Sequence, residues 1–131
     1  MKEIDFLKMR EALEASWDEK TSYMGAKKTG NPAPGQCYPT SWVVQHFFPE
    51  MEIVRGFVWN GKGIEKHYWN VLETKDGLIH IDLTWQQFPH GSCVRGFETL
   101  DRNELNDTEP TIKRCETLLE RVTRYLEKAN D

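Results

Sequence analysis

The chain has 131 residues, a formal net charge of −4 and a hydrophobic content of 38%, with five Trp, six Phe and four Tyr. This composition is typical of a single domain over residues 1–131 that buries a core without disulfide support. The modest charge and the lack of a Lys/Arg-rich segment argue against nucleic acid as a partner. No apolar segment reaches membrane-spanning length, and the first residues lack the apolar core of a signal peptide.

Three cysteines, Cys37, Cys93 and Cys115, lie far apart in the sequence. An odd number at such spacing does not suggest a disulfide framework. A reducing, cytoplasmic location is therefore expected.

The first half of the chain predicts two helices separated by a polar segment. Apolar residues recur at steps of three and four over residues 5–17, which predicts a helix. Residues 18–36 are rich in Gly, Pro and polar side chains, which predicts a loop. A loop of this length in a small domain more often has a function than merely connects two elements at the surface. Residues 39–48 are apolar nearly all round and predict a central, buried helix that Pro49 ends.

The second half predicts strands and a final helix. Residues 51–59 predict a strand, and residues 67–85 predict a hairpin with its turn at residues 75–77. The pattern weakens over residues 86–107, which we expect to be mostly loop. Residues 110–129 predict a helix with Pro110 in its first turn and Thr108 or Asp107 as its cap. Its apolar stripe comprises Ile112, Cys115, Leu118, Leu119, Val122, Tyr125 and Leu126, so Cys115 is expected to be inert core.

The hairpin brings a histidine and an aspartate to one face. Side chains alternate between the faces of a strand, so an even turn places His67 and Asp82 on the same side. A tight Asp76–Gly77 turn leaves them diagonal, a slightly longer loop brings them together, and a bulge breaks the parity. An imidazole beside a carboxylate is two thirds of a catalytic triad, because the carboxylate fixes the tautomer and stabilises the imidazolium.

Cys37 is the cysteine placed for reactivity, because it lies where the polar segment enters the second helix. Unpaired N–H groups and the positive end of the helix dipole favour a thiolate there, as does a nearby imidazolium. Pro39 disfavours helical geometry at Tyr38, so we expect Cys37 just outside the first turn.

Three sequence blocks in this order carry a resemblance to known families. The segment Gly35-Gln36-Cys37 resembles the active-site Gly-Gln-Cys of transglutaminases. The two hairpin strands resemble the His-x-Trp and Asp-x-Thr blocks of the transglutaminase-like core, through His67-Tyr68-Trp69 and Asp82-Leu83-Thr84. Tyr38-Pro39 departs from the usual Trp-Val after the cysteine.

Residues 13–89 are still more similar to the small bacterial YunG-like family. The shared blocks are Ser16-Trp17, Thr21-Ser22, Pro34-Gly35-Gln36-Cys37 with Thr40, Val43-Val44-Gln45, His67-Tyr68-Trp69-Asn70, Ile81-Asp82-Leu83-Thr84 and Gln87-Phe88-Pro89.

These resemblances imply an α+β, papain-like (transglutaminase-core-like) fold, in which a central helix packs on a small antiparallel sheet between N- and C-terminal helices. They imply Cys37 as nucleophile, His67 as base and then acid, and Asp82 as the orienting carboxylate, with no cofactor and no metal. The activity expected is hydrolysis or acyl transfer on an amide, ester or thioester, whose substrate the sequence does not identify.

Four further residues are expected to bind substrate: Gln36, Trp17, Trp69 and His80. Aromatic side chains near such a thiol exclude water and shape the groove. In papain-like enzymes an upstream glutamine helps form the oxyanion hole, but Gln36 is adjacent to the cysteine, so the backbone N–H of Cys37 is the safer donor. His46 and His80 are predicted to have structural roles. His80 could also line the cleft beside His67.

Two other readings remain open. A domain of this fold can lose turnover and persist as a binding module. Alternatively, four residues could converge on zinc, although only His90-x-x-Cys93 comes close to the spacing of structural zinc sites. The candidate zinc ligands are Cys37, His67, His90 and Cys93.

Overall fold

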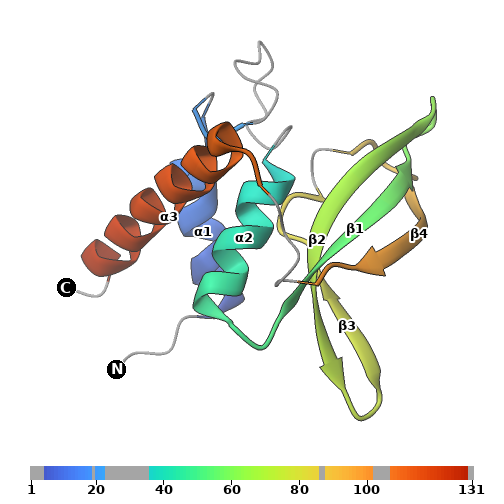
Figure 1. Ribbon diagram of the computed structural model, residues 1–131, viewed down its shortest axis with the longest axis horizontal. Helices are drawn as coiled ribbons and strands as arrows, with labels where there is room; N and C mark the ends of the chain where they lie inside the picture. Colours follow the sequence, from blue (N-terminus) through green and yellow to red (C-terminus); the bar gives the residue numbers. More distant parts are fainter. Residues whose placement is uncertain (1–4, 19, 23–35, 86–87, 102–106, 130–131) are drawn as a thin grey trace.

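The computed structural model describes residues 5–18, 20–22, 36–85, 88–101 and 107–129. Its elements are three helices and a four-stranded antiparallel sheet, which confirms the predicted α+β class. Figure 1 shows the helices on one side and the sheet on the other, with helix α2 between the sheet and helices α1 and α3. Most of the segment 18–36, predicted as a polar loop, lies outside the described residues.

Helices α1 (Phe6–Ser16) and α3 (Glu109–Ala129) confirm the first and last predicted helices. Asp5 caps α1 by accepting a hydrogen bond from the Lys8 N–H at 2.8 Å, and Thr108 caps α3 by accepting one from the Thr111 N–H at 3.4 Å. The predicted stripe of α3 is too wide, because Ile112 and Tyr125 are exposed. The α3 side chains that are buried are Cys115, Leu118, Val122 and Leu126.

Helix α2 (Cys37–Phe47) begins two residues earlier than predicted, with Cys37 as its first residue. The expectation that Pro39 keeps Cys37 outside the first turn is therefore wrong. Pro39 is the third helical residue, where the missing N–H would have had no intrahelical acceptor. The hydroxyl of Tyr38 donates to the Asp107 carboxylate at 2.8–2.9 Å, which ties the first turn of α2 to the segment before α3.

Helix α2 is also less deeply buried than its composition predicts. Val43 and Val44 are fully buried, whereas Trp42 and Phe47 are half-buried and His46 is exposed. The His46 ring stacks on Trp42 and meets Phe47 edge-on, which supports its structural reading.

The sheet runs in the order β3-β2-β1-β4. Strands β1 (Glu52–Trp59), β2 (Ile64–Thr74) and β3 (Gly77–Ile81) correspond to the predicted strand and hairpin. Strand β4 (Cys93–Thr99) lies in the segment predicted to be mostly loop, so that prediction is wrong there. It pairs with β1, and the register shifts between Phe57 and Val58.

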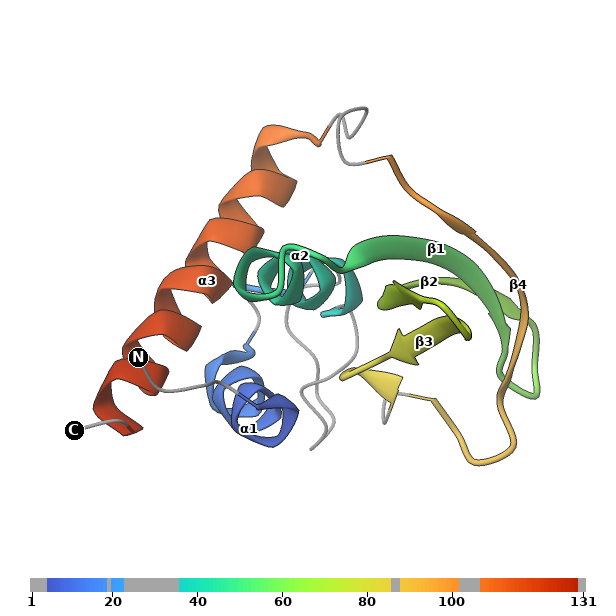
Figure 2. The ribbon, with the colours of Figure 1, turned by 90° about the horizontal axis from the view of Figure 1, so that it is seen from below.

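The sheet curls until its two edge strands approach each other across one face. His80 of β3 and Phe97 of β4 lie with ring centroids 5.0 Å apart, although β2 and β1 separate their strands in the sheet. The irregularity in the β1–β4 pairing is of the kind that bends a strand. Figure 2 shows the resulting arc of strands beside the end-on view of α2.

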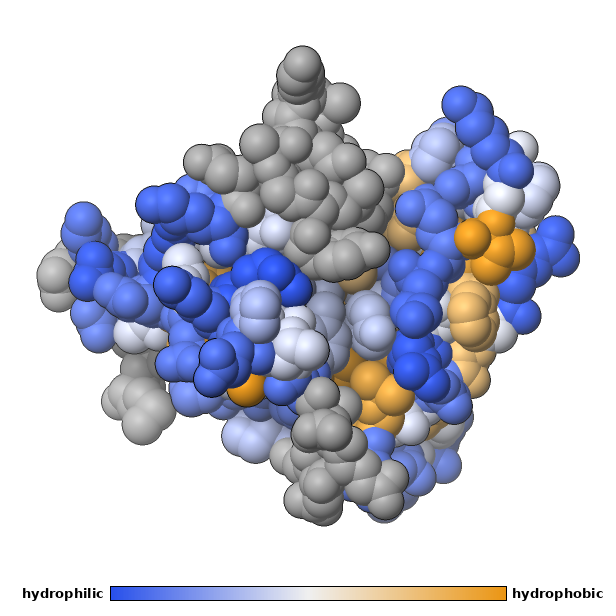
Figure 3. Space-filling model, turned by 45° about the horizontal axis from the view of Figure 1, so that its top comes forward, coloured by the Kyte–Doolittle hydropathy of each residue, from blue (hydrophilic) through white to orange (hydrophobic). Residues whose placement is uncertain are grey.

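Two clusters of buried apolar side chains hold these layers together. The larger joins the three helices and comprises Met9, Ala12, Leu13, Trp17, Val43, Val44, Met51, Leu118, Val122 and Leu126. The smaller lies on the inner face of the curled sheet and comprises Val54, Trp69 and Val71. Figure 3 shows a mainly hydrophilic surface over the helices and more apolar surface over the sheet. Exposed apolar side chains of the strands include Phe57, Ile64 and Phe97.

Candidate functional site

His67 and Asp82 lie on the same face of the hairpin, as the parity of the sequence predicts. The register pairs Asn70 with Ile81 and Thr74 with Gly77, so the turn is at residues 75–76, one position earlier than a tight Asp76–Gly77 turn. His67 and Asp82 are therefore diagonal neighbours beyond the last pair of β2 and β3. They nevertheless meet, with His67 Nε2 and Asp82 Oδ2 2.6 Å apart.

Thr84 fixes the other oxygen of the Asp82 carboxylate. Its backbone N–H and its hydroxyl both donate to Asp82 Oδ1 at 3.1 Å. This is the local pattern of an aspartate that accepts from the residue two positions on. Both carboxylate oxygens are thus engaged, and Asp82 is held in one orientation toward His67.

The side chain of Cys37 also hydrogen-bonds to the imidazole of His67. Since Asp82 takes Nε2, the ring nitrogen left for the thiol is Nδ1. Burial by itself would lower the pKa of His67, but hydrogen bonds to Asp82 and to Cys37, together with the negative charges of both groups, raise it to about 9. His67 is fully buried, whereas Cys37 is partly exposed. Part of Cys37 is therefore accessible to solvent, whereas the side chain of His67 is not.

Aromatic rings enclose His67 on several sides. Trp69 stacks on it with ring centroids 5.6 Å apart, and Phe88 and Trp85 meet it edge-on at 4.7 and 6.2 Å. These rings exclude water from the imidazole, so its positive charge is balanced mainly by the carboxylate of Asp82.

Trp69 is held in place from two directions. Its indole Nε1–H donates to His80 Nδ1 at 2.9 Å, so His80 is linked to His67 through Trp69. On β1, Gly56 lies opposite His67 and leaves room for the indole, because a Cβ at Gly56 would lie 2.2 Å from Trp69 Cη2. The structure thus brings Trp69 and His80 to the same face as His67 and Asp82.

Gln36 and Trp17, both predicted to bind substrate, lie where the start of α2 packs against the end of α1. Both are buried. Gln36 Oε1 accepts from the Thr21 hydroxyl at 2.7 Å, and Gln36 Nε2 donates to the Asp18 carbonyl at 3.0 Å. Trp17 Nε1–H donates to the hydroxyl of Thr40 at 3.0 Å. Their polar groups face the protein and fix the first turn of α2.

Three contributors to this site were not assigned a role from the sequence. Thr84 could have been found, because an Asp followed two residues later by Thr is a common side-chain-to-backbone pattern. Phe88 and Gly56 carried no such signal, since their roles depend on how the strands and the following turn are placed in space.

Neither a cluster of metal ligands nor a membrane-spanning helix is found among the described residues. There, no three His, Cys, Asp or Glu side chains are placed to hold a metal ion. In the same part of the chain, no helix has the length and apolar character required to cross a membrane.

No curated protein and no solved structure matches the chain. A family model described as YunG protein matches residues 5–127, which include every residue of the site described above. The chain belongs to the YunG family.

Proposed function

We propose that this protein is a thiol-dependent acyl-transfer enzyme of papain-like or transglutaminase-like type. It would act as a hydrolase or acyltransferase on an amide, ester or thioester. The observation that carries the proposal is the arrangement of Cys37, His67 and Asp82. A partly exposed thiol at a helix start adjoins a buried imidazole, whose far nitrogen lies 2.6 Å from a carboxylate that Thr84 fixes.

The chemistry follows from these positions. The Cys37 thiolate attacks the carbonyl carbon of the substrate, and the His67 imidazolium gives its proton to the leaving group as the acyl-enzyme forms. Neutral His67 then takes a proton from water or an amine, which attacks the thioester and releases Cys37. Asp82 keeps the imidazole oriented and stabilises its charged form throughout.

The first turn of α2 supplies donors for the oxyanion. Amide groups at a helix start have no intrahelical acceptor and point along the axis. Pro39 has no N–H, so the donors beside the thiol are the backbone N–H groups of Cys37 and Tyr38. Gln36, whose side-chain amide is hydrogen-bonded to Thr21 and Asp18, supports this turn from behind.

Alkylation by iodoacetamide, followed at each cysteine by mass spectrometry, tests the activated thiol. We expect Cys37 to react faster than exposed Cys93 at pH 6–7, and buried Cys115 to react only after unfolding. His67→Ala should slow Cys37 by at least about tenfold and leave Cys93 unchanged. Asp82→Asn, a smaller change, provides a second variant in case His67→Ala does not fold.

Turnover is tested separately with a panel of acyl thioesters, esters and glutamine-containing peptides, comparing the wild type with Cys37→Ala. A covalent adduct of acyl mass on Cys37, absent from Cys37→Ala, is the expected result. If Cys37 instead labels at the rate of Cys93 and carries no acyl group with any substrate class, the enzyme proposal fails and a binding module is favoured.

A further inference from the structure

A second concave surface lies on helix α3, and none of the triad residues lines it. It has a volume of about 670 Å³, within the usual range for small-molecule sites. Its lining combines α3 with the connection after α1 and comprises Lys20, Pro110, Lys113, Arg114, Thr117, Glu120, Arg121 and Arg124. Five of these side chains are cationic and one is a carboxylate, in a chain whose net charge is −4.

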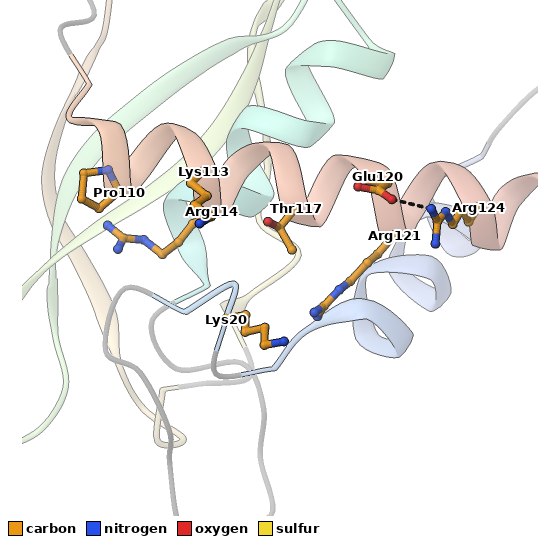
Figure 4. Close-up of a pocket in the computed structure, with 8 residues that line it drawn as sticks. All are labelled: Lys20, Pro110, Lys113, Arg114, Thr117, Glu120, Arg121 and Arg124. Carbon is orange, nitrogen blue, oxygen red and sulfur yellow. Dashed lines mark ion pairs between the residues drawn. The ribbon is translucent and has the colours of Figure 1, made fainter.

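The cationic residues are ordered along one side of the helix. Arg114, Thr117, Arg121 and Arg124 follow one another at steps of three, four and three, which keeps them on one helix face. Figure 4 shows Arg114, Thr117 and Arg121 extending from α3 on the side where Lys20 lies. Ten residues of helix separate the outer two arginines, a rise of about 15 Å. One phosphate cannot contact both ends.

The charges of this surface are only partly balanced within the protein. Arg121 pairs with Asp18 at 2.9 Å and Arg124 pairs with Glu120. Within the described ranges, no ion pair is formed by Lys20, Lys113 or Arg114.

Arg114 also has hydrogen-bonding capacity left over. Its Nη2 donates to the Thr111 hydroxyl at 3.0 Å, while its Nε is buried and has no acceptor among the described residues. A buried donor without a partner is costly, and the planar guanidinium is suited to two oxygens of one anion. An incoming oxyanion could therefore accept hydrogen bonds that the Arg114 guanidinium does not make within the described residues.

We propose that this surface binds a small molecule that carries two or more phosphate groups. Arg114 and Lys113 would hold one anionic group, with Arg121 and Arg124 near the other and Thr117 donating between them. Arginine and lysine side chains on a concave surface favour phosphate oxygens through charge-assisted hydrogen bonds. The proposal does not depend on the acyl-transfer activity, because none of Cys37, His67 and Asp82 lines this surface.

Isothermal titration with inorganic triphosphate and with inorganic phosphate, at a constant ionic strength of about 0.15 M, tests this site. We expect triphosphate to bind in a saturable, one-to-one manner and phosphate to bind at least about tenfold more weakly, since it spans only part of the surface. Triphosphate should also raise the melting temperature of the protein.

The variants Lys113→Ala and Arg114→Ala should each weaken triphosphate binding by about tenfold or more. Lys113 is exposed, so its loss leaves the fold intact if Arg114→Ala proves unstable. The matched control is Arg10→Ala, since Arg10 is an exposed helix arginine paired with Glu14 four residues away. Absence of saturable binding, equal affinity in Arg10→Ala and Arg114→Ala, or equal binding of phosphate and triphosphate would each overturn the proposal.

Discussion

The imidazole of His67 carries its positive charge in a place from which aromatic rings exclude water. Desolvation opposes this charge, and the hydrogen bonds and negative charges of Asp82 and Cys37 outweigh it, so that the pKa of His67 rises to about 9. At neutral pH the site therefore holds an imidazolium. That is the form which can donate a proton to a leaving group and stabilise a thiolate beside it.

Removing the charge of Asp82 should reverse this balance. In Asp82→Asn the desolvation of His67 remains while its strongest attraction is lost, so the pKa of His67 should fall from about 9 by at least about one unit. Histidine NMR signals followed from pH 5 to pH 10 measure it directly.

The matched control for this titration is Asp76→Asn, which removes a carboxylate from the exposed turn of the same hairpin. It should leave the titration of His67 unchanged. If Asp82→Asn and Asp76→Asn give the same His67 pKa as the wild type, the carboxylate of Asp82 does not hold the imidazolium.

At the scale of the elements, the geometry of the site depends on how close β1 and β2 approach under Trp69. The indole of Trp69 occupies the space that a Cβ on Gly56 would need. Such a Cβ would also lie 2.8 Å from the carbonyl oxygen of Gly96. The indole can retreat only by giving up its stacking on His67 or its hydrogen bond to His80. The missing side chain at Gly56 therefore helps to position the indole of Trp69 against the imidazole of His67.

Gly56→Ala should destabilise the protein by about 1–3 kcal/mol, through overpacking, and should slow the alkylation of Cys37. Urea unfolding gives the free energy of unfolding, and mass spectrometry gives the labelling rate. Gly96→Ala is the control, because a Cβ there would meet nothing within 4 Å. If Gly96→Ala lowers the free energy of unfolding and the labelling rate as much as Gly56→Ala does, the effect comes from the strand backbone and not from the contact with Trp69.

The hairpin and β4 show what the sequence can predict about the sheet. The shared face of His67 and Asp82 follows from the two-residue period of a strand, and it is confirmed. The exact register is not predictable in this way, because the turn falls one residue earlier than the Asp-Gly pair suggests. Strand β4 was missed since nearly all its side chains are exposed, so no alternation of burial marks it. Its pairing with β1 is a tertiary contact.

At the scale of the whole molecule, the turn that carries the thiol is tied to the C-terminal helix. Arg121 of α3 donates to the Ser16 carbonyl at 2.9 Å and pairs with Asp18 at 2.9 Å. The Asp18 carbonyl accepts from Gln36, the residue that precedes Cys37. Burial would raise the pKa of Asp18, but the hydrogen bonds and charge of Arg121, with nearby backbone N–H groups, lower it.

The pairing of His67 with Asp82 is easier to predict from the sequence than the position of Cys37, because prediction from periodicity works only over short stretches of chain. His67 and Asp82 belong to one hairpin, so local periodicity relates them. Cys37 lies 30 residues before His67 in the sequence, and only the packing of α2 against β2 brings it to the imidazole. The order of the three residues suggests the triad, but nothing in the spacing indicates that Arg121 of α3 contacts Asp18, whose carbonyl accepts from Gln36.

Arg121→Ala should therefore affect a site to which Arg121 makes no contact. Losing its bond to the Ser16 carbonyl and its pair with Asp18 should cost about 1–2 kcal/mol of unfolding free energy. It should also slow iodoacetamide labelling of Cys37 several-fold, while Cys93 serves as the internal reference. Arg124→Ala is the matched control, since its partner Glu120 is on the same helix and both side chains are largely exposed.

The control should change stability by no more than about 0.5 kcal/mol and leave the labelling of Cys37 unaltered. Restoring the charge alone, with Arg121→Lys, should recover part of the pairing with Asp18 but not the planar donor to the Ser16 carbonyl. Labelling of Cys37 in Arg121→Lys should accordingly fall between the wild type and Arg121→Ala. If Arg121→Ala lowers stability and Cys37 still reacts at the wild-type rate, α3 stabilises the fold without positioning the thiol.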